Sequence, residues 1–171
     1  MKKLLLYLIL SSFLPFSAIG QTVSTQTNKS CLKGPGYWKN HSACQSNGTG
    51  TKRNATWDLI KGYDKDGNES SGEQTIFFKS KQNYCEVFDT NPGKGGKYYI
   101  LAHKYITAQL NILATPNTVD TDNVFGESTT FLSTYTPEEI KSSKTLQRES
   151  VKLSSELASF SNRLNCDDIE N

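Results

Sequence analysis

The stretch Tyr98-Tyr-Ile-Leu-Ala-His-Lys-Tyr-Ile-Thr-Ala-Gln-Leu-Asn-Ile-Leu113 decides the fold that the sequence predicts. Its apolar side chains recur at helical spacing and fall on two adjoining faces. The first face carries Tyr98, Leu101, Ala102, Tyr105 and Ile112, and the second carries Tyr99, His103, Ile106, Leu110 and Leu113. A helix that is apolar over most of its circumference is surrounded by other elements, so we expect residues 98–113 to form the central helix. Thr115-Pro116 should end it, because proline cannot continue a helix.

A second long helix is predicted over residues 136–164. It begins with Thr136-Pro-Glu-Glu139, where threonine caps the helix, proline takes the first position and glutamate the third. Apolar residues then recur on one face: Leu146, Leu153, Leu157, Phe160 and Leu164. Polar side chains fill the other faces, so this amphipathic helix should pack one stripe on the core.

Shorter helical elements are predicted elsewhere. We expect Ser80 to cap a helix over residues 80–88, which a turn at residues 91–96 then ends. Residues 122–133 predict another short helix. Residues 55–60 predict a helical turn or two with Trp57 and Ile60 on one face. The fold class is therefore mostly α, a small disulfide-stapled helical domain with a long loop-rich N-terminal half.

The first 20 residues predict a secretory signal peptide. Met1-Lys2-Lys3 precedes an apolar run over residues 4–10, and Ala18 and Gly20 supply the small side chains expected before a cleavage site. The run is too short and interrupted for a membrane span, and an uncleaved N-terminal anchor is the alternative. Residues 21–30 should be a flexible leader, and residues 31–171 a single domain. We therefore expect a secreted, extracellular protein without stable membrane insertion.

The charge balance argues against nucleic acid as a partner. Removing Lys2 and Lys3 with the signal peptide lowers the basic residues from 19 to 17, which equals the 17 acidic residues. Phosphate binding needs a surplus of lysine and arginine on one face. The chain also lacks a Gly-rich phosphate loop and the motifs His-Glu-x-x-His and Gly-x-Ser-x-Gly. No cofactor is predicted, and the oligomeric state stays open.

The cysteines predict two disulfides in an exported protein, with three possible pairings. They are Cys31, Cys44, Cys85 and Cys166. A zinc site with His41 and His103 as additional ligands is the alternative. No Cys-x-x-Cys or His-x-x-x-His spacing supports it, so no metal site is predicted.

Two features of the N-terminal half concern its surface. Residues 64–69 suggest a calcium loop, but Gly62 occupies the first ligand position, where a carboxylate is needed, so an exposed turn is favoured. The other calcium-loop positions that match are Asp64, Asp66, Gly67 and Glu73. Five asparagines lie in Asn-x-Ser/Thr triplets and are candidate glycosylation sites if the host is a eukaryote: Asn28, Asn40, Asn47, Asn54 and Asn68.

Aromatic residues and histidines supply the candidate site. Tyr37, Trp38, His41 and Trp57 are the candidate binding residues, because amphipathic aromatics suit a glycan-binding surface. The competing interpretation, which we favour, is that Tyr37 and Trp38 plug the helical core. His41 or His103 would serve a hydrolase as a general base. No Ser-His-Asp or Cys-His spacing supports that role, so we expect structural histidines.

Two longer motifs resemble a widespread secreted module. Cys31 with Gly36-Tyr-Trp-Lys-Asn-His41 is similar to its Cys…GYWKNH opening, and residues 99–111 are similar to its central LAHQxIAAxLN helix. The final helix and Cys166 fit its end, whereas Cys44 and Cys85 are additions to the pattern. The resemblance implies that the module's own cysteines pair, which gives Cys31–Cys166 and Cys44–Cys85. It implies export but no reaction or ligand.

Two classes of function remain open. The favoured class is a non-catalytic structural or recognition module, extracellular or at the cell surface, with a glycan or matrix protein as partner. The alternative is a small secreted hydrolase that uses His41 or His103 with an acid such as Asp58 or Glu86.

Overall fold

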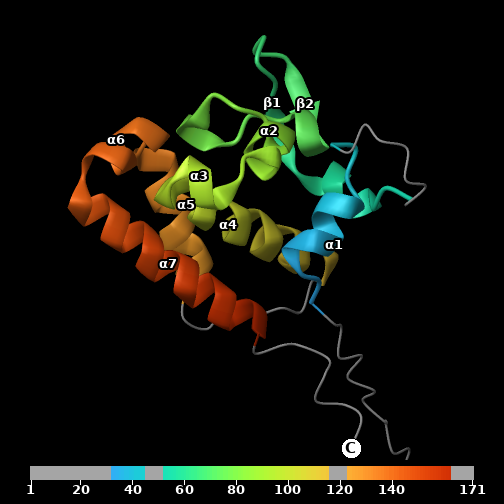
Figure 1. Cartoon of the computed structure of the whole chain (residues 1–171). Coiled ribbons are helices and arrows are strands. Elements are labelled where there is room, and N and C mark those ends of the chain that lie inside the picture. The colour runs from blue at the N-terminus through green and yellow to red at the C-terminus, as the bar shows by residue number, and fades with distance from the viewer. Residues whose placement is uncertain (1–31, 45–51, 116–122, 163–171) are drawn as a thin grey trace, which may run out of the picture.

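The computed structural model describes residues 32–44, 52–115 and 123–162, and over these ranges the protein is mostly helical, as predicted. Figure 1 shows α7 running along one side of the molecule and the β1–β2 hairpin projecting at the opposite edge. None of the helices in these ranges has the length and hydropathy needed to cross a membrane. In chain order the helices (α), 3₁₀ turns (η) and strands (β) are α1 (Pro35–Asn40), η1 (Ala55–Leu59), β1 (Lys61–Tyr63), β2 (Glu69–Ser71), η2 (Gly72–Gln74), η3 (Phe78–Ser80), α2 (Tyr84–Asp89), α3 (Pro92–Gly95), α4 (Lys97–Ala114), α5 (Val124–Thr134), α6 (Pro137–Ser142) and α7 (Lys144–Asn162).

Helix α4 is the central helix, as the sequence predicted. It contacts every other α-helix described, and its buried apolar side chains form the middle of the core. Gly96 precedes it with φ of 84°, a conformation that favours glycine. The helix ends at Ala114, just before the Thr115-Pro116 pair. Residues 98–113 therefore form a helix surrounded on most sides.

Small side chains let α7 approach α4 closely. Ser150 and Ser154 lie buried on the same stripe of α7 as Leu153 and Leu157. The Ser150 hydroxyl donates to the Lys97 carbonyl oxygen at 2.7 Å, which ties α7 to the first turn of α4. The predicted amphipathic stripe is thus confirmed for the described part of this helix.

The single helix predicted over residues 136–164 is wrong in one respect. Ser143 is extended, with φ −113° and ψ 113°, and separates α6 from α7. Its hydroxyl accepts the Leu146 N–H at 3.3 Å, as a residue that begins a new helix does. The predicted start is confirmed, since Thr136 and Glu139 exchange side-chain and backbone hydrogen bonds. Apolar periodicity on both sides of Ser143 concealed the break.

Asn83, and not Ser80, caps the helix predicted over residues 80–88. The Asn83 side chain accepts the Glu86 N–H, and the Glu86 carboxylate accepts the Asn83 N–H, both at 2.9 Å. The Ser80 hydroxyl instead donates to the Phe77 carbonyl oxygen at 2.6 Å.

The short helix predicted over residues 122–133 is confirmed as α5 from Val124 onward. The expected turn at residues 91–96 contains the four-residue α3.

The β1–β2 hairpin was not predicted. Its strands are three residues long and have no alternation of apolar and polar side chains, which is the signal that identifies a strand. Asp64 shapes the turn between them, because its carboxylate accepts the N–H groups of Asn68 and Asp66, each at 2.9 Å. These hydrogen bonds hold the pKa of Asp64 below its usual value. The predicted exposed turn is confirmed.

Asn111 joins the opening segment of the domain to α4. Its side-chain oxygen accepts two hydrogen bonds, from the Lys33 N–H at 2.8 Å and the Trp38 indole N–H at 3.0 Å. Its amide nitrogen donates to the Lys33 carbonyl oxygen at 2.9 Å. Asn111 and Trp38 are each 1 % exposed, so the bond between them lies in the core, whereas the two bonds to Lys33 are partly buried. The two motifs on which the family resemblance rests therefore meet in space.

A disulfide between Cys44 and Cys85 ties the end of the opening segment to α2. This bridge is one of the two that the resemblance implied. The other two cysteines, Cys31 and Cys166, lie outside the described residues, and their pairing stays a prediction.

Candidate functional site

Tyr37 and His41 use their side chains within the protein. The two rings stack with centroids 3.9 Å apart and planes 20° apart, and the Lys33 ammonium lies 5.2 Å from the Tyr37 centroid. The Tyr37 hydroxyl accepts the Asn54 side-chain amide at 3.1 Å. Both residues are half-buried. Little of Tyr37 remains to contact a ligand.

Trp38 and Trp57 are core residues, with exposed fractions of 1 % and 0 %. Trp57 lies edge-on to the rings of Tyr84 and Phe88, at centroid distances of 6.3 and 6.1 Å. Neither indole has a face open to a sugar ring, which corrects the hypothesis that they stack against a glycan. Trp38 instead fills the core, as the plug interpretation expects, because its large apolar surface is most stable there.

Both candidate general bases bond to backbone carbonyl groups. His41 Nδ1 lies 2.8 Å from the Tyr37 carbonyl oxygen, and His103 Nε2 lies 2.8 Å from that of Val87. Burial lowers the pKa of His103, so its ring is neutral at physiological pH. His103 borders a small cleft in which Lys39 and Asp89 form an ion pair of 3.0 Å. Each histidine fixes a backbone segment.

The two acids named for a hydrolase are also engaged elsewhere. Asp58 pairs with Arg53 at 2.8 Å, and Glu86 pairs with Lys65 at 2.6 Å while capping α2. Among the described residues neither acid contacts His41 or His103, so those residues supply no such acid–base pair. The same ranges contain no group of three side chains that could hold a metal ion.

Glu73 is the most buried carboxylate described, with 3 % of its surface exposed. It accepts two hydrogen bonds from Arg53, at 2.7 and 2.9 Å, and one from the Ala43 N–H at 2.8 Å. Glu73 and Asp58 raise the pKa of Arg53. Such a paired and hydrogen-bonded buried charge is structural, and here it anchors the segment beside the disulfide to η2.

The candidate glycosylation sites differ in accessibility. Asn40 and Asn68 are exposed, at the end of α1 and in the hairpin turn. Asn54 is half-buried, and its amide nitrogen, the atom that would carry a glycan, donates to Tyr37 while its oxygen caps η1. A glycan on Asn54 would break this contact. Asn28 and Asn47 lie outside the described residues.

A groove beside the hairpin has the properties of a ligand site. It encloses about 510 Å³ and is lined by β1, by the segment that follows η2, and by α2, α4 and α5. We call it the hairpin groove, and its principal residues are Tyr63, Phe78, Tyr84, Tyr105, Gln109 and Thr129. Ligand sites are typically concave, about 300–1,000 Å³ in volume, largely apolar, and furnished with a few polar groups.

Aromatic rings form one wall of the hairpin groove. Tyr105 stacks on Phe125 with centroids 4.6 Å apart and meets Phe78 edge-on at 5.2 Å. Tyr63 is 62 % exposed. The packed rings fix one wall, whereas Tyr63 remains available at the surface.

Fixed polar groups alternate with these rings. The Tyr84 hydroxyl donates to the Gln109 side-chain oxygen at 2.9 Å. The Tyr105 hydroxyl lies 3.0 Å from the Thr129 hydroxyl, which donates to a backbone carbonyl and therefore accepts from Tyr105. Burial raises the pKa of Tyr105 to about 12, so its hydroxyl keeps its proton at physiological pH. Tyr84 and Tyr105 are 4 % and 2 % exposed, so these hydrogen bonds hold the groove wall in place, and Tyr63 is the exposed aromatic side chain beside it.

Comparison with protein-family models, curated proteins and solved structures finds no match for this chain. The resemblance to a secreted module therefore stays a prediction.

The sequence did not predict the residues of the hairpin groove. They come from segments between residues 61 and 129 that are brought together only when the chain folds. Tyr63 beside an Asp-Gly turn was the one local signal, since an aromatic next to an exposed turn is itself often exposed.

Proposed function

We propose that the protein is an exported, non-catalytic recognition module that binds a glycan in the hairpin groove. The observation that carries this proposal is Tyr63, a largely exposed aromatic side chain beside a groove whose other wall is packed aromatic rings. Sugar rings have apolar faces and polar edges, and tyrosine combines an apolar body with a polar tip. The groove matches both properties.

The groove wall contains a buried hydroxyl group. Thr75 lines the hairpin groove and is 3 % exposed, and its hydroxyl has no hydrogen-bond partner among the described residues. An unsatisfied buried polar group costs about 1–3 kcal/mol. Because this hydroxyl is itself buried, a ligand could bond to it only if the groove wall moved.

Export is supported by two observations. The Cys44–Cys85 disulfide is of a kind that forms and persists in oxidising compartments. The first 20 residues have the charge and hydropathy pattern of a signal peptide.

The proposed non-catalytic role is supported by the side-chain contacts of the candidate catalytic residues. Within the fold, each of these side chains bonds to a backbone carbonyl oxygen or to an oppositely charged side chain: His41, His103, Asp58 and Glu86.

Replacing Tyr63 by alanine is expected to weaken glycan binding about fivefold, because an aromatic contact contributes roughly 1 kcal/mol. The purified protein would first be applied to a glycan array, and the best glycan would then be titrated by calorimetry. Leu59→Ala is the matched control, since Leu59 is also an exposed large apolar residue, at 52 %, but does not line the groove. Equal affinity of Tyr63→Ala and Leu59→Ala, or an array without any bound glycan, would refute the proposal.

A further inference from the structure

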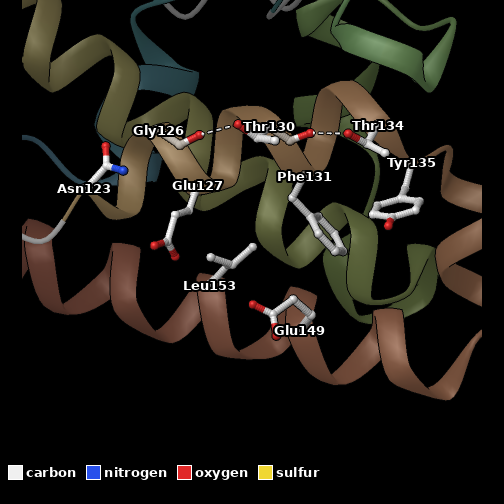
Figure 2. A pocket seen from close by; sticks show the side chains of 9 residues that line it. All are labelled: Asn123, Gly126, Glu127, Thr130, Phe131, Thr134, Tyr135, Glu149 and Leu153. Atoms are coloured by element: carbon white, nitrogen blue, oxygen red, sulfur yellow. Dashed lines mark hydrogen bonds between the residues drawn. The ribbon is translucent and has the colours of Figure 1, made fainter.

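The groove between α5 and α7 encloses about 540 Å³, and several of its polar side chains bond within their own helices (Figure 2). Thr130 and Thr134 each donate to a backbone carbonyl oxygen one turn earlier on α5, at 3.1 and 2.7 Å. Glu149 pairs with Lys152 on α7 at 3.4 Å. The hairpin groove differs, because its exposed aromatic residue, Tyr63, lies on a strand of only three residues. The position of that strand therefore decides where the Tyr63 ring lies.

Gly62 lies in the middle of β1, lines the hairpin groove, and has no room for a side chain. A Cβ atom at this position would lie 2.6 Å from the Cγ2 atom of Thr75, whereas ordinary van der Waals contact is 3.4–4 Å. Gly62 does not have a positive φ, so its backbone conformation does not require glycine. What glycine permits here is the close approach of β1 to Thr75.

Thr75 is held in place on the other side of this contact. Its N–H donates to the Gly72 carbonyl oxygen at 3.2 Å, and its carbonyl oxygen accepts the Tyr84 N–H at 3.1 Å. Thr75 is also 3 % exposed. A threonine side chain has few allowed conformations, and a packed interior resists displacement. The Thr75 methyl group is therefore a fixed surface against which β1 lies.

The strand is tied to the same segment directly after Gly62. The Tyr63 carbonyl oxygen accepts the Ile76 N–H at 2.8 Å, and Ile76 is the residue that follows Thr75. A side chain at position 62 would push β1 away from Thr75 and lengthen this hydrogen bond. Because Tyr63 follows Gly62 in the strand, its ring would move with the backbone.

We propose that Gly62 is a positioning residue of the hairpin groove: by letting β1 lie against Thr75, it holds the Tyr63 ring where a ligand stacks on it. This role rests on the proposed function, because glycan binding is assigned to Tyr63. Binding residues must be held within about 0.5 Å of their productive position, so a shift of the strand matters. The same packing accounts for glycine at the first position of the candidate calcium loop, since the contact with Thr75 leaves no space for a carboxylate there.

Gly62→Ala is expected to weaken the best glycan from the array about fivefold, as loss of the Tyr63 ring does. In protein without glycan it should also shift the NMR resonances of Tyr63. Thr75→Ser removes the Cγ2 atom and keeps the hydroxyl. The double variant Gly62→Ala/Thr75→Ser should therefore regain the affinity and the Tyr63 resonances of Thr75→Ser alone. Mere destabilisation by Gly62→Ala would not be reversed in this way, because removing a buried methyl group is itself destabilising.

Gly36→Ala is the matched control, since no atom lies within 4 Å of a Cβ atom there and Gly36 does not line the groove. Equal affinity of Gly62→Ala and Gly36→Ala, or a double variant that binds as weakly as Gly62→Ala, would overturn the positioning role. If the parent binds no glycan, the proposed function fails, and unchanged Tyr63 resonances in Gly62→Ala would separately overturn the positioning role. If Gly62→Ala does not fold, the double variant decides, because it folds only if the Thr75 methyl group is the obstacle.

Discussion

Replacing Asn111 by alanine is expected to lower the free energy of unfolding by about 3 kcal/mol. The change removes three hydrogen bonds and leaves the buried Trp38 indole N–H without its acceptor. An unsatisfied buried donor alone costs about 1–3 kcal/mol, and the cavity left by the side chain adds to that loss. Denaturant unfolding followed by tryptophan fluorescence and circular dichroism measures the effect.

The control for Asn111 is another asparagine in the same protein. Asn40→Ala removes an identical side chain from an exposed position at the end of α1 and should change stability by less than about 0.5 kcal/mol in unglycosylated protein. If Asn111→Ala were as stable as Asn40→Ala, the opening segment would not depend on α4 for its position.

Removing the Cys44–Cys85 disulfide is expected to lower the free energy of unfolding by about 4 kcal/mol. The cysteines are 41 residues apart in sequence, and the chain-entropy estimate for a loop of that length gives this value. The double variant Cys44→Ala/Cys85→Ala would be compared with the parent in guanidinium chloride, with circular dichroism to confirm its helical content.

Single variants provide the internal control for the disulfide. Cys44→Ala and Cys85→Ala should each lose about as much stability as the double variant, because either change removes the same covalent bond. A loss below about 1 kcal/mol in the double variant would show that the bridge does not restrict the unfolded chain.

The local patterns that predicted helices correctly are those in which packing and propensity agree. Residues 98–113 are apolar on adjoining faces, so their helix and its central place followed from periodicity. The Thr136–Glu139 start followed from capping chemistry. Burial of Trp38 was also expected, because a large aromatic beside a cysteine in a small domain is most stable inside the core.

The features that could not be predicted depend on contacts between distant segments. Nothing near Asn111 in the sequence indicates that it bonds to Lys33 and Trp38, more than 70 residues away. Likewise Tyr63, Tyr105 and Thr129 line the hairpin groove together only because the fold brings residues of β1, α4 and α5 to one place. The break at Ser143 was concealed because the apolar spacing suits one long helix or two shorter ones.

The opening motif, with its tyrosine, tryptophan and histidine, uses its side chains in contacts within the fold, and we propose recognition at the hairpin groove instead. Trp38, His41 and His103 each have a polar atom bonded to a core side chain or to a backbone carbonyl oxygen. None of these contacts involves the residues that line the hairpin groove.

Hydrogen exchange at the Trp38 indole N–H tests this account most directly. Trp38 is 1 % exposed and donates to the equally buried Asn111, so its indole proton should exchange only when the whole domain unfolds. The free energy of exchange measured by NMR should then equal the free energy of unfolding measured with denaturant. Exchange as fast as that of an exposed indole would contradict the structural role of the opening motif.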